Sequence, residues 1–142
     1  LATGKATFET EVPSWEHWRS KHLSHSQFVY TKNEEVLGWI ALSAVSTRKV
    51  YEGVAEVSIY VDPKHSGMGI GNSLMNQLIR SSEDHGIWTL QSSVFPENEA
   101  TIRLHLKNGF RKIGKREKIA RLHGQWKDTI ILERRSSRAG TV

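Results

Sequence analysis

The chain has 142 residues, 37% hydrophobic and 25% charged, a composition typical of one soluble globular domain large enough to bury a core. It contains no cysteine, which excludes disulfide scaffolds, cysteine-ligated metals, iron–sulfur clusters and a nucleophilic thiolate. The longest apolar stretch, residues 36–45, is too short for a membrane span, and residues 1–10 lack the order of a signal peptide. We therefore expect a cytoplasmic protein.

Basic residues are concentrated in the last third of the chain, although the net charge is only +5. Residues 99–142 hold 12 Lys and Arg against 4 Asp and Glu, whereas residues 1–98 hold 8 against 11. Such a region is typical of a nucleic-acid surface, of a site for a small anionic ligand, or of a solvated pair of strands. Charge alone leaves these three alternatives open.

The first half of the chain predicts mainly strands. Alternating patterns and β-branched residues predict them over residues 5–11, 28–31, 36–45 and 54–61. Ser14 is a candidate cap for a helix that runs to about His25. The run 54–61 is the most strand-like, with Glu56 and Ser58 on one face, and we expect it to lie centrally in the sheet.

The second half predicts helices and a terminal hairpin. Periodicity and breakers predict helices over 72–86 and 98–107, and strands over 88–94, 110–121 and 125–133. This order predicts a single α/β domain over 1–135, with a mixed sheet and helices on its faces. The polar segment 136–142 is expected to be disordered.

A glycine-rich loop, His65-Ser-Gly-Met-Gly-Ile-Gly71, lies between the central strand and a predicted helix. Glycines let the backbone turn its amides inward, and the helix N-terminus adds partial positive charge, so this context suits an anion. A dinucleotide fingerprint requires glycine where Asn72 stands, and the Gly-Lys-Ser/Thr of a P-loop is missing. The loop therefore favours a pyrophosphate of another kind over a turn without a ligand.

Four segments, in this order along the chain, resemble the GNAT superfamily of N-acetyltransferases. They read EVSIYVDP (56–63), GMGIG (67–71), PENEA (96–100) and LHLKNGF (104–110). The chain is most similar to the phosphinothricin and methionine sulfoximine acetyltransferase branch, with its arsinothricin-acetylating relatives, from Ala6 to about Arg135. The resemblance implies an α/β acyl-CoA N-acyltransferase fold that lacks its first strand and helix here, as in a chain truncated at its N-terminus.

The resemblance also implies that acetyl-CoA binds between the central strand and the next one, and no metal. The residues implied to contact it are Ile59, Tyr60, Val61, Ser66, Gly67, Met68, Gly69, Ile70, Gly71, Asn72 and Asn98. Ser66 stands where the superfamily usually has Arg or Gln, so a phosphate contact would have to come from Lys64 or His65. Asn98 suits a helix cap as well as a cofactor contact.

Glu56 is the candidate general base, because an amine that is protonated at neutral pH must lose a proton before it attacks the thioester. Partial burial in an apolar strand would raise the pKa of its carboxyl toward the useful range. The alternative is an exposed strand residue or an ion pair with Arg48. His105 stands where the superfamily often has a tyrosine that protonates the leaving thiolate; it could also hold a water, bind the substrate or be a core histidine.

The resemblance implies that Phe8, Arg48 and Tyr51 contact an amino-acid acceptor with an anionic, tetrahedral side-chain group. The hairpin around Trp126 resembles one that lies near the active site and the interface of a homodimer. We expect acetylation of the α-amine of a small glutamate-like amino acid or toxin, and thus detoxification or herbicide resistance, with no nucleic-acid or membrane partner. The alternatives are another amine (a polyamine, an antibiotic or a protein), a nucleic-acid-binding module, or a non-catalytic CoA-binding domain.

Overall fold

The computed structural model describes residues 20–141. Its strands are β1 (Phe28–Lys32), β2 (Glu35–Ala44), β3 (Val54–Val61), β4 (Thr89–Val94), β5 (Arg111–Leu122) and β6 (Gln125–Arg135). Its helices are α2 (Ile70–Asp84) and α3 (Glu99–Lys107), with short 3-10 turns η1 (Lys49–Tyr51) and η2 (Pro63–His65). The predicted order from the 28–31 strand onward is confirmed, whereas the 5–11 strand and Ser14 lie outside the described residues.

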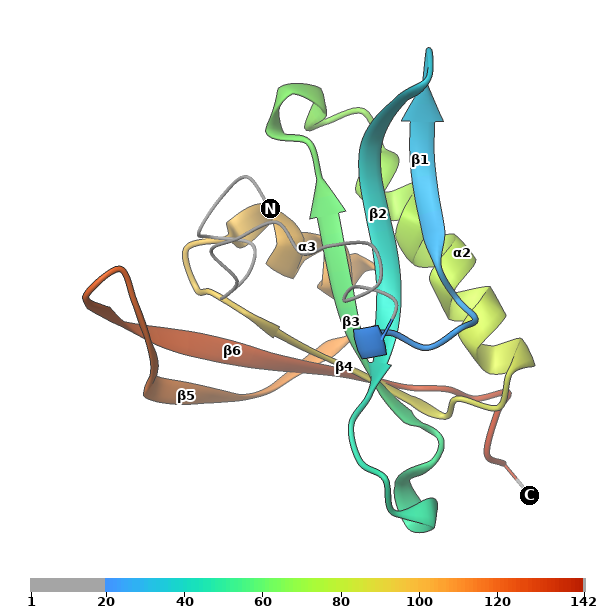
Figure 1. Cartoon of the computed structure of the whole chain (residues 1–142). Helices are drawn as coiled ribbons and strands as arrows, with labels where there is room; N and C mark the ends of the chain where they lie inside the picture. Colours follow the sequence, from blue (N-terminus) through green and yellow to red (C-terminus); the bar gives the residue numbers. More distant parts are fainter. Residues whose placement is uncertain (1–19, 142) are drawn as a thin grey trace.

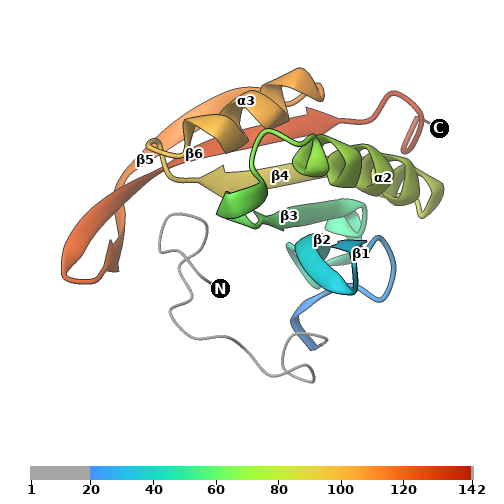
Figure 2. The ribbon, with the colours of Figure 1, turned by 90° about the horizontal axis from the view of Figure 1, so that it is seen from above.

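The strands form one mixed sheet in the order β1-β2-β3-β4-β6-β5 (Figure 1). β3 is antiparallel to β2 and parallel to β4, and the other neighbours are antiparallel. The mixed α/β sheet and the central place of residues 54–61 are therefore confirmed. Within the described part of the chain, both α-helices lie on the same face of the sheet (Figure 2).

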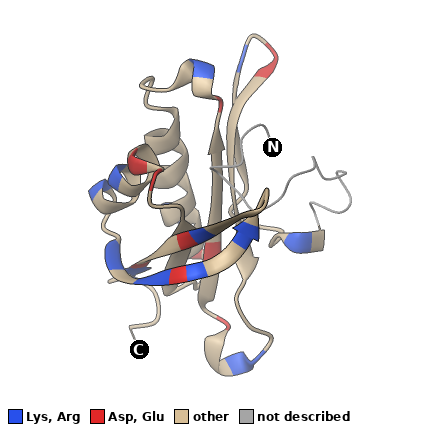
Figure 3. Ribbon diagram, turned by 90° about the vertical axis from the view of Figure 1, so that its left-hand side faces the viewer, with Lys and Arg blue, Asp and Glu red and all other residues tan. Residues whose placement is uncertain are grey.

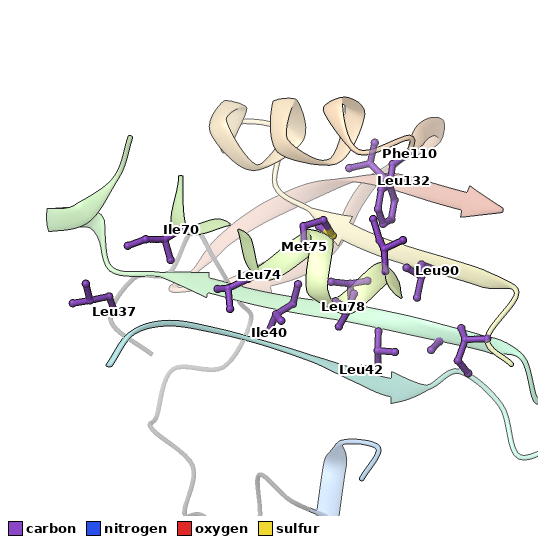
Figure 4. Close-up of a cluster of buried hydrophobic side chains, with 14 residues drawn as sticks. Leu37, Ile40, Leu42, Ile70, Leu74, Met75, Leu78, Leu90, Phe110 and Leu132 are labelled. Atoms are coloured by element: carbon purple, nitrogen blue, oxygen red, sulfur yellow. The ribbon is translucent and has the colours of Figure 1, made fainter. Parts of the chain in front are cut away.

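The core lies between that face and α2 (Figure 4). Four side chains recur at helical spacing on the buried side of α2: Leu74, Met75, Leu78 and Ile79. They pack against sheet residues that alternate along their strands, among them Leu42, Val57, Leu90 and Leu132. Each large apolar side chain buried here contributes roughly 1.5–3 kcal/mol. The strand residues that alternate with these core residues point to the opposite face of the sheet.

Several helix boundaries differ from the predicted ones: α2 ends at Asp84 rather than residue 86, and α3 begins at Glu99 rather than residue 98. α2 begins at Ile70 rather than residue 72, because Ile70 is buried and Gly71 lets the helix approach Leu104, 3.1 Å from the position of a Cβ at residue 71. The prediction that the first helix reaches about His25 is wrong, because residues 22–27 are not helical. There the Leu23 amide donates to the Leu42 carbonyl oxygen at 2.8 Å, which ties this segment to the sheet.

The segment 136–140, expected to be disordered, folds back onto the domain. The Arg135 guanidinium donates to the carbonyl oxygens of Ser136 (2.6 Å) and Ala139 (2.9 Å). The Ser136 hydroxyl donates to the carboxylate of Glu83 (2.5 Å), whose side chain is only 6% exposed. The buried carboxylate of Glu83 and the guanidinium of Arg135 thus hold in place a segment whose own composition is typical of a disordered tail.

His105 is a fully buried polar residue on α3. Its Nδ1 donates to the Thr101 carbonyl oxygen at 2.7 Å, and its ring packs edge-to-face on Phe110, with centroids 4.8 Å apart. Burial lowers the pKa of His105 from its ordinary value of 6.5, and the bond to Thr101 offsets part of this effect. The imidazole is therefore neutral near pH 7, with its lone pair on Nε2.

Gly53 and Trp88 are in contact where β3 and β4 begin. The Gly53 carbonyl accepts from the amides of Trp88 (2.7 Å) and Thr89 (3.0 Å), and a Cβ at residue 53 would lie 2.0 Å from the Trp88 ring. We expect Gly53→Ala to lower the free energy of unfolding by about 1–3 kcal/mol, because the indole must shift. Urea denaturation followed by circular dichroism measures this.

Gly114→Ala is the matched control, because no heavy atom lies within 4 Å of a Cβ at that position and its backbone is not in the left-handed region. Equal urea midpoints for the two variants would contradict the close contact between Gly53 and Trp88.

Candidate functional site

Among residues 20–141, no backbone carbonyl accepts from the amides of residues 67–72, in the glycine loop and at the start of α2. Gly67 and Gly69 have φ of 82° and 78°, and no atom lies within 4 Å of a Cβ at either position. Gly69 caps α2 without a side-chain hydrogen bond, and the Ser73 amide donates to the Gly69 carbonyl oxygen at 3.0 Å, which closes the first turn of the helix. The amides that open the helix are therefore available to an anion, as the sequence predicts.

The other predicted residues of this loop have different surroundings. Met68 is 51% exposed. His65 Nδ1 lies 3.5 Å from a carboxylate oxygen of Asp62, while the Asp62 side chain accepts from the Lys64 amide at 3.0 Å. The Asn72 side chain accepts from Asn108 at 3.1 Å, so it joins α2 to the end of α3.

β3 and β4 are paired only at their amino ends. The parallel ladder joins Val54 to Thr89, Ala55 to Leu90 and Glu56 to Gln91, and then stops. β3 continues to Val61 and β4 to Val94 while the two strands diverge (Figure 1). Within the described part of the chain, the backbone of residues 59–61 therefore has no strand partner on the β4 side and suits an extended, amide-containing chain. The side chain of Tyr60 packs on Trp39 on the face away from α2, with centroids 6.5 Å apart.

Glu56 occupies the last rung of that short ladder. It alternates with the core residues Ala55 and Val57, so its half-buried side chain lies on the face opposite the helices. Its neighbours across the strands are Ser43 on β2 and Gln91 on β4. Within residues 20–141 no ion pair joins Glu56 to Arg48, the alternative that the sequence leaves open.

The predicted acceptor residues lie at the amino end of β3, opposite to the glycine loop at its carboxyl end (Figure 1). The Arg48 guanidinium lies 5.9 Å from the ring centroid of Tyr51, and both side chains are exposed. Phe8 lies outside the described residues. Arg48 and Tyr51 are thus adjacent, and Glu56 lies between them and the glycine loop along β3.

Asn98 and Trp126 lie toward the other half of the molecule. The Asn98 side chain accepts from the Thr101 amide at 3.4 Å and so caps α3, in agreement with the helix-cap alternative. Trp126 is 60% exposed, with the Arg121 guanidinium 5.9 Å from its ring. Trp126 therefore does not belong to the hydrophobic core.

Sequence reasoning did not single out Ser43 or Gln91. Gln91 lies between the buried Leu90 and Ser92, and Ser43 follows the buried Leu42, so the period-two direction of strand side chains places both on the same face as Glu56. Their proximity to Glu56 depends on strand order and register, which the sequence pattern does not reveal.

Comparison with known proteins identifies relatives over most of the chain. The family model of the acetyltransferase (GNAT) family matches residues 3–110. YwnH of Bacillus subtilis strain 168 is 32% identical over 143 residues, 96% of this chain and 87% of that protein. The phosphinothricin N-acetyltransferase of Streptomyces coelicolor A3(2) is 29% identical over 136 residues, 90% of this chain and 80% of that protein.

A solved structure agrees with these matches. The crystal structure of a GNAT superfamily phosphinothricin acetyltransferase from Sinorhizobium meliloti in complex with AcCoA has a TM-score of 0.85. It is 25% identical, and the match covers 99% of this chain and 80% of that one. Within residues 20–141, no helix is both long and apolar enough to cross a membrane.

The free amides at the start of α2 fit the pyrophosphate of acetyl-CoA, and the unpaired edge of β3 fits its amide-containing arm. With the family match, these features show that the chain belongs to the acetyltransferase (GNAT) family and is an acetyl-CoA-dependent N-acetyltransferase.

Proposed function

We propose that the enzyme acetylates the α-amine of a small glutamate-like amino acid or toxin of the phosphinothricin, methionine sulfoximine or arsinothricin type. The position of Glu56 carries this proposal, because its carboxylate lies where β3 and β4 separate, on the open face of the sheet. The similarity to a phosphinothricin N-acetyltransferase supports the acceptor class. Detoxification follows, because such a toxin loses its charged amine on acetylation.

Acetyl-CoA would be held by backbone groups at two places. The amides of residues 67–72 would bind the pyrophosphate, and residues 59–61 would pair with the pantetheine arm, with Asn98 beside it. Acetyl-CoA supplies an electrophilic acetyl carbon on a good leaving group. Because the contacts are mainly with backbone amides, Ser66 in place of Arg or Gln removes one side-chain contact and leaves the main anion site in place.

Glu56 would act as the general base. Its carboxylate takes one proton from the acceptor ammonium, and the freed nitrogen lone pair then attacks the acetyl carbon. As the carbon–sulfur bond breaks, a second proton leaves the nitrogen and passes to the departing thiolate, which gives the N-acetyl amide and the free thiol of CoA. The departing thiolate needs little acid assistance, since a thiol has a pKa near 8.5. His105 is buried and neutral, so it suits accepting a hydrogen bond from a water or thiol better than donating a proton.

Arg48 and Tyr51 would bind the far end of the acceptor. A guanidinium binds a phosphinate, arsonate or carboxylate through two parallel hydrogen bonds, and Arg48 is exposed with its cation 5.9 Å from the Tyr51 ring. Phe8 would add an aromatic wall. This cation also disfavours polyamine acceptors, because their positive charges would be repelled.

We also propose that two copies associate through the hairpin of β5 and β6. The supporting observation is a set of large apolar side chains exposed on it: Ile113 (47%), Ile119 (54%) and Trp126 (60%).

Glu56→Gln keeps the shape of the side chain and removes the base. We expect kcat to fall by about 10²- to 10⁴-fold while the Kd for CoA, measured by calorimetry, stays within about twofold. The reaction is followed as release of free thiol, and the protein contributes no thiol of its own.

The matched control is Glu35→Gln, an exposed glutamate at the start of β2 that should leave kcat unchanged. A Glu56→Gln enzyme with the wild-type rate across the pH range would remove Glu56 from the role of base.

Arg48→Ala should raise the KM for a glutamate-like acceptor by about tenfold or more, with little change in the KM for acetyl-CoA, because the lost bonds hold only the acceptor. Lys49→Ala removes the adjacent cation and serves as the control. An unaltered acceptor KM in Arg48→Ala would make Arg48 an ordinary surface residue.

A further inference from the structure

Three polar residues form a row across the centre of the sheet. Ser43 on β2 is paired with Glu56 on β3, and Glu56 is paired with Gln91 on β4. Residues paired across neighbouring strands have Cβ atoms about 5 Å apart, so the three side chains rise side by side from one face. We call Ser43, Glu56 and Gln91 the polar row.

The polar row lies on the open face and has unused hydrogen-bonding capacity. All three side chains are half-buried, while their strand neighbours Leu42, Ala55 and Leu90 belong to the core on the opposite face. Within residues 20–141, no hydrogen bond or ion pair engages any of the three side chains, although each carries an oxygen that can accept. Half-buried polar groups that have no hydrogen-bond partner within the protein can bind a ligand through hydrogen bonds.

The row also has a defined place relative to the expected thioester. Glu56 and Gln91 form the last rung of the parallel ladder, and the backbone edge of β3 is free beyond it. A ligand bound to the polar row therefore lies next to the point where β3 and β4 separate.

A primary ammonium matches this row. It has three N–H donors, and the polar row offers a hydroxyl, a carboxylate and a carboxamide oxygen, none of which is positively charged. We propose that the polar row binds the primary ammonium of the acceptor and that Gln91 is a specificity-determining residue for primary over N-methylated amines. The proposal rests on the proposed role of Glu56 as base.

This arrangement assigns each N–H bond a role. One proton passes from nitrogen to a carboxylate oxygen of Glu56 before the attack, while the two remaining N–H bonds donate to Ser43 and Gln91. These two bonds fix the direction of the freed lone pair. After the attack one of their two protons passes to the departing thiolate, and the amide product keeps the other. An N-methyl amine lacks one of the three donors, so it leaves the Gln91 or Ser43 oxygen unpaired or turns its lone pair away.

The test compares each primary amine with its N-methyl derivative. The acceptors are phosphinothricin, methionine sulfoximine, glutamate and spermidine, and the measurement is kcat/KM for thiol release by the full chain. The variants are Gln91→Met, which keeps the length of the side chain and removes its oxygen, and Gln91→Glu, which keeps an acceptor oxygen. Gln77→Met, the same change at an exposed position of α2, is the control.

We expect the wild type and Gln77→Met to favour the primary amine by about 10- to 100-fold. Gln91→Met should lose about tenfold in kcat/KM for the primary amine and little for the N-methyl amine, so that the preference shrinks. Gln91→Glu should keep the preference, and calorimetry should give an unchanged Kd for CoA in every variant. A Gln91→Met enzyme that loses both rates equally, or neither, overturns the proposal.

Failure of the proposed function gives a different result. If the glutamate analogues are not acetylated but spermidine is, the acceptor class is wrong, and the same comparison with N-methylated spermidine still decides the role of Gln91. If Glu56→Gln retains full activity while Gln91→Met lowers the preference, the base assignment is wrong and the contact with the amine stands.

Discussion

β3 and β4 run parallel, yet only three residue pairs join them before they separate. Each strand is held in its direction by its other neighbour, because seven pairs join β3 to β2 and six join β4 to β6. One core then fixes the two halves of the sheet relative to each other, since a single cluster of buried side chains includes α2 residues, Val57 of one half and Leu132 of the other. The gap between β3 and β4 that would receive acetyl-CoA is therefore maintained by the β2–β3 pairing on one side and the β4–β6 pairing on the other.

The chain order of the elements, and Glu56 on the open face of a central strand, could be predicted from periodicity because these are properties of short segments. The relation of Glu56 to Gln91 could not, because it depends on the register of two strands more than thirty residues apart in sequence. The predicted start of α2 is two residues late, because Gly69 and Gly71 are typical loop residues in sequence and the contact of this part of the helix with Leu104 depends on tertiary structure. The order of residues 136–140 depends on Glu83, which no local pattern reveals.

The basic C-terminal third has a physical explanation in the fold. Lys and Arg are distributed along the β5–β6 hairpin together with acidic residues (Figure 3). Three ion pairs join basic side chains of this region to carboxylates. The distances from the side-chain nitrogen to the nearest carboxylate oxygen are 2.8 Å for Arg111–Glu133, 3.4 Å for Lys115–Asp128 and 3.2 Å for Lys127–Glu97. Part of the charge that makes this region look like a nucleic-acid surface in sequence is therefore engaged within the domain. Exposed ion pairs of this kind contribute little to stability, roughly 0–1 kcal/mol each.

The most direct test of the account is a crystal structure of this chain with acetyl-CoA. The account predicts the pantetheine arm along residues 59–61, between β3 and β4, the pyrophosphate on the amides at the start of α2, and the acetyl group beside Glu56 and Gln91. A complex in which β3 and β4 are paired along their full length, with the cofactor bound elsewhere, would contradict it.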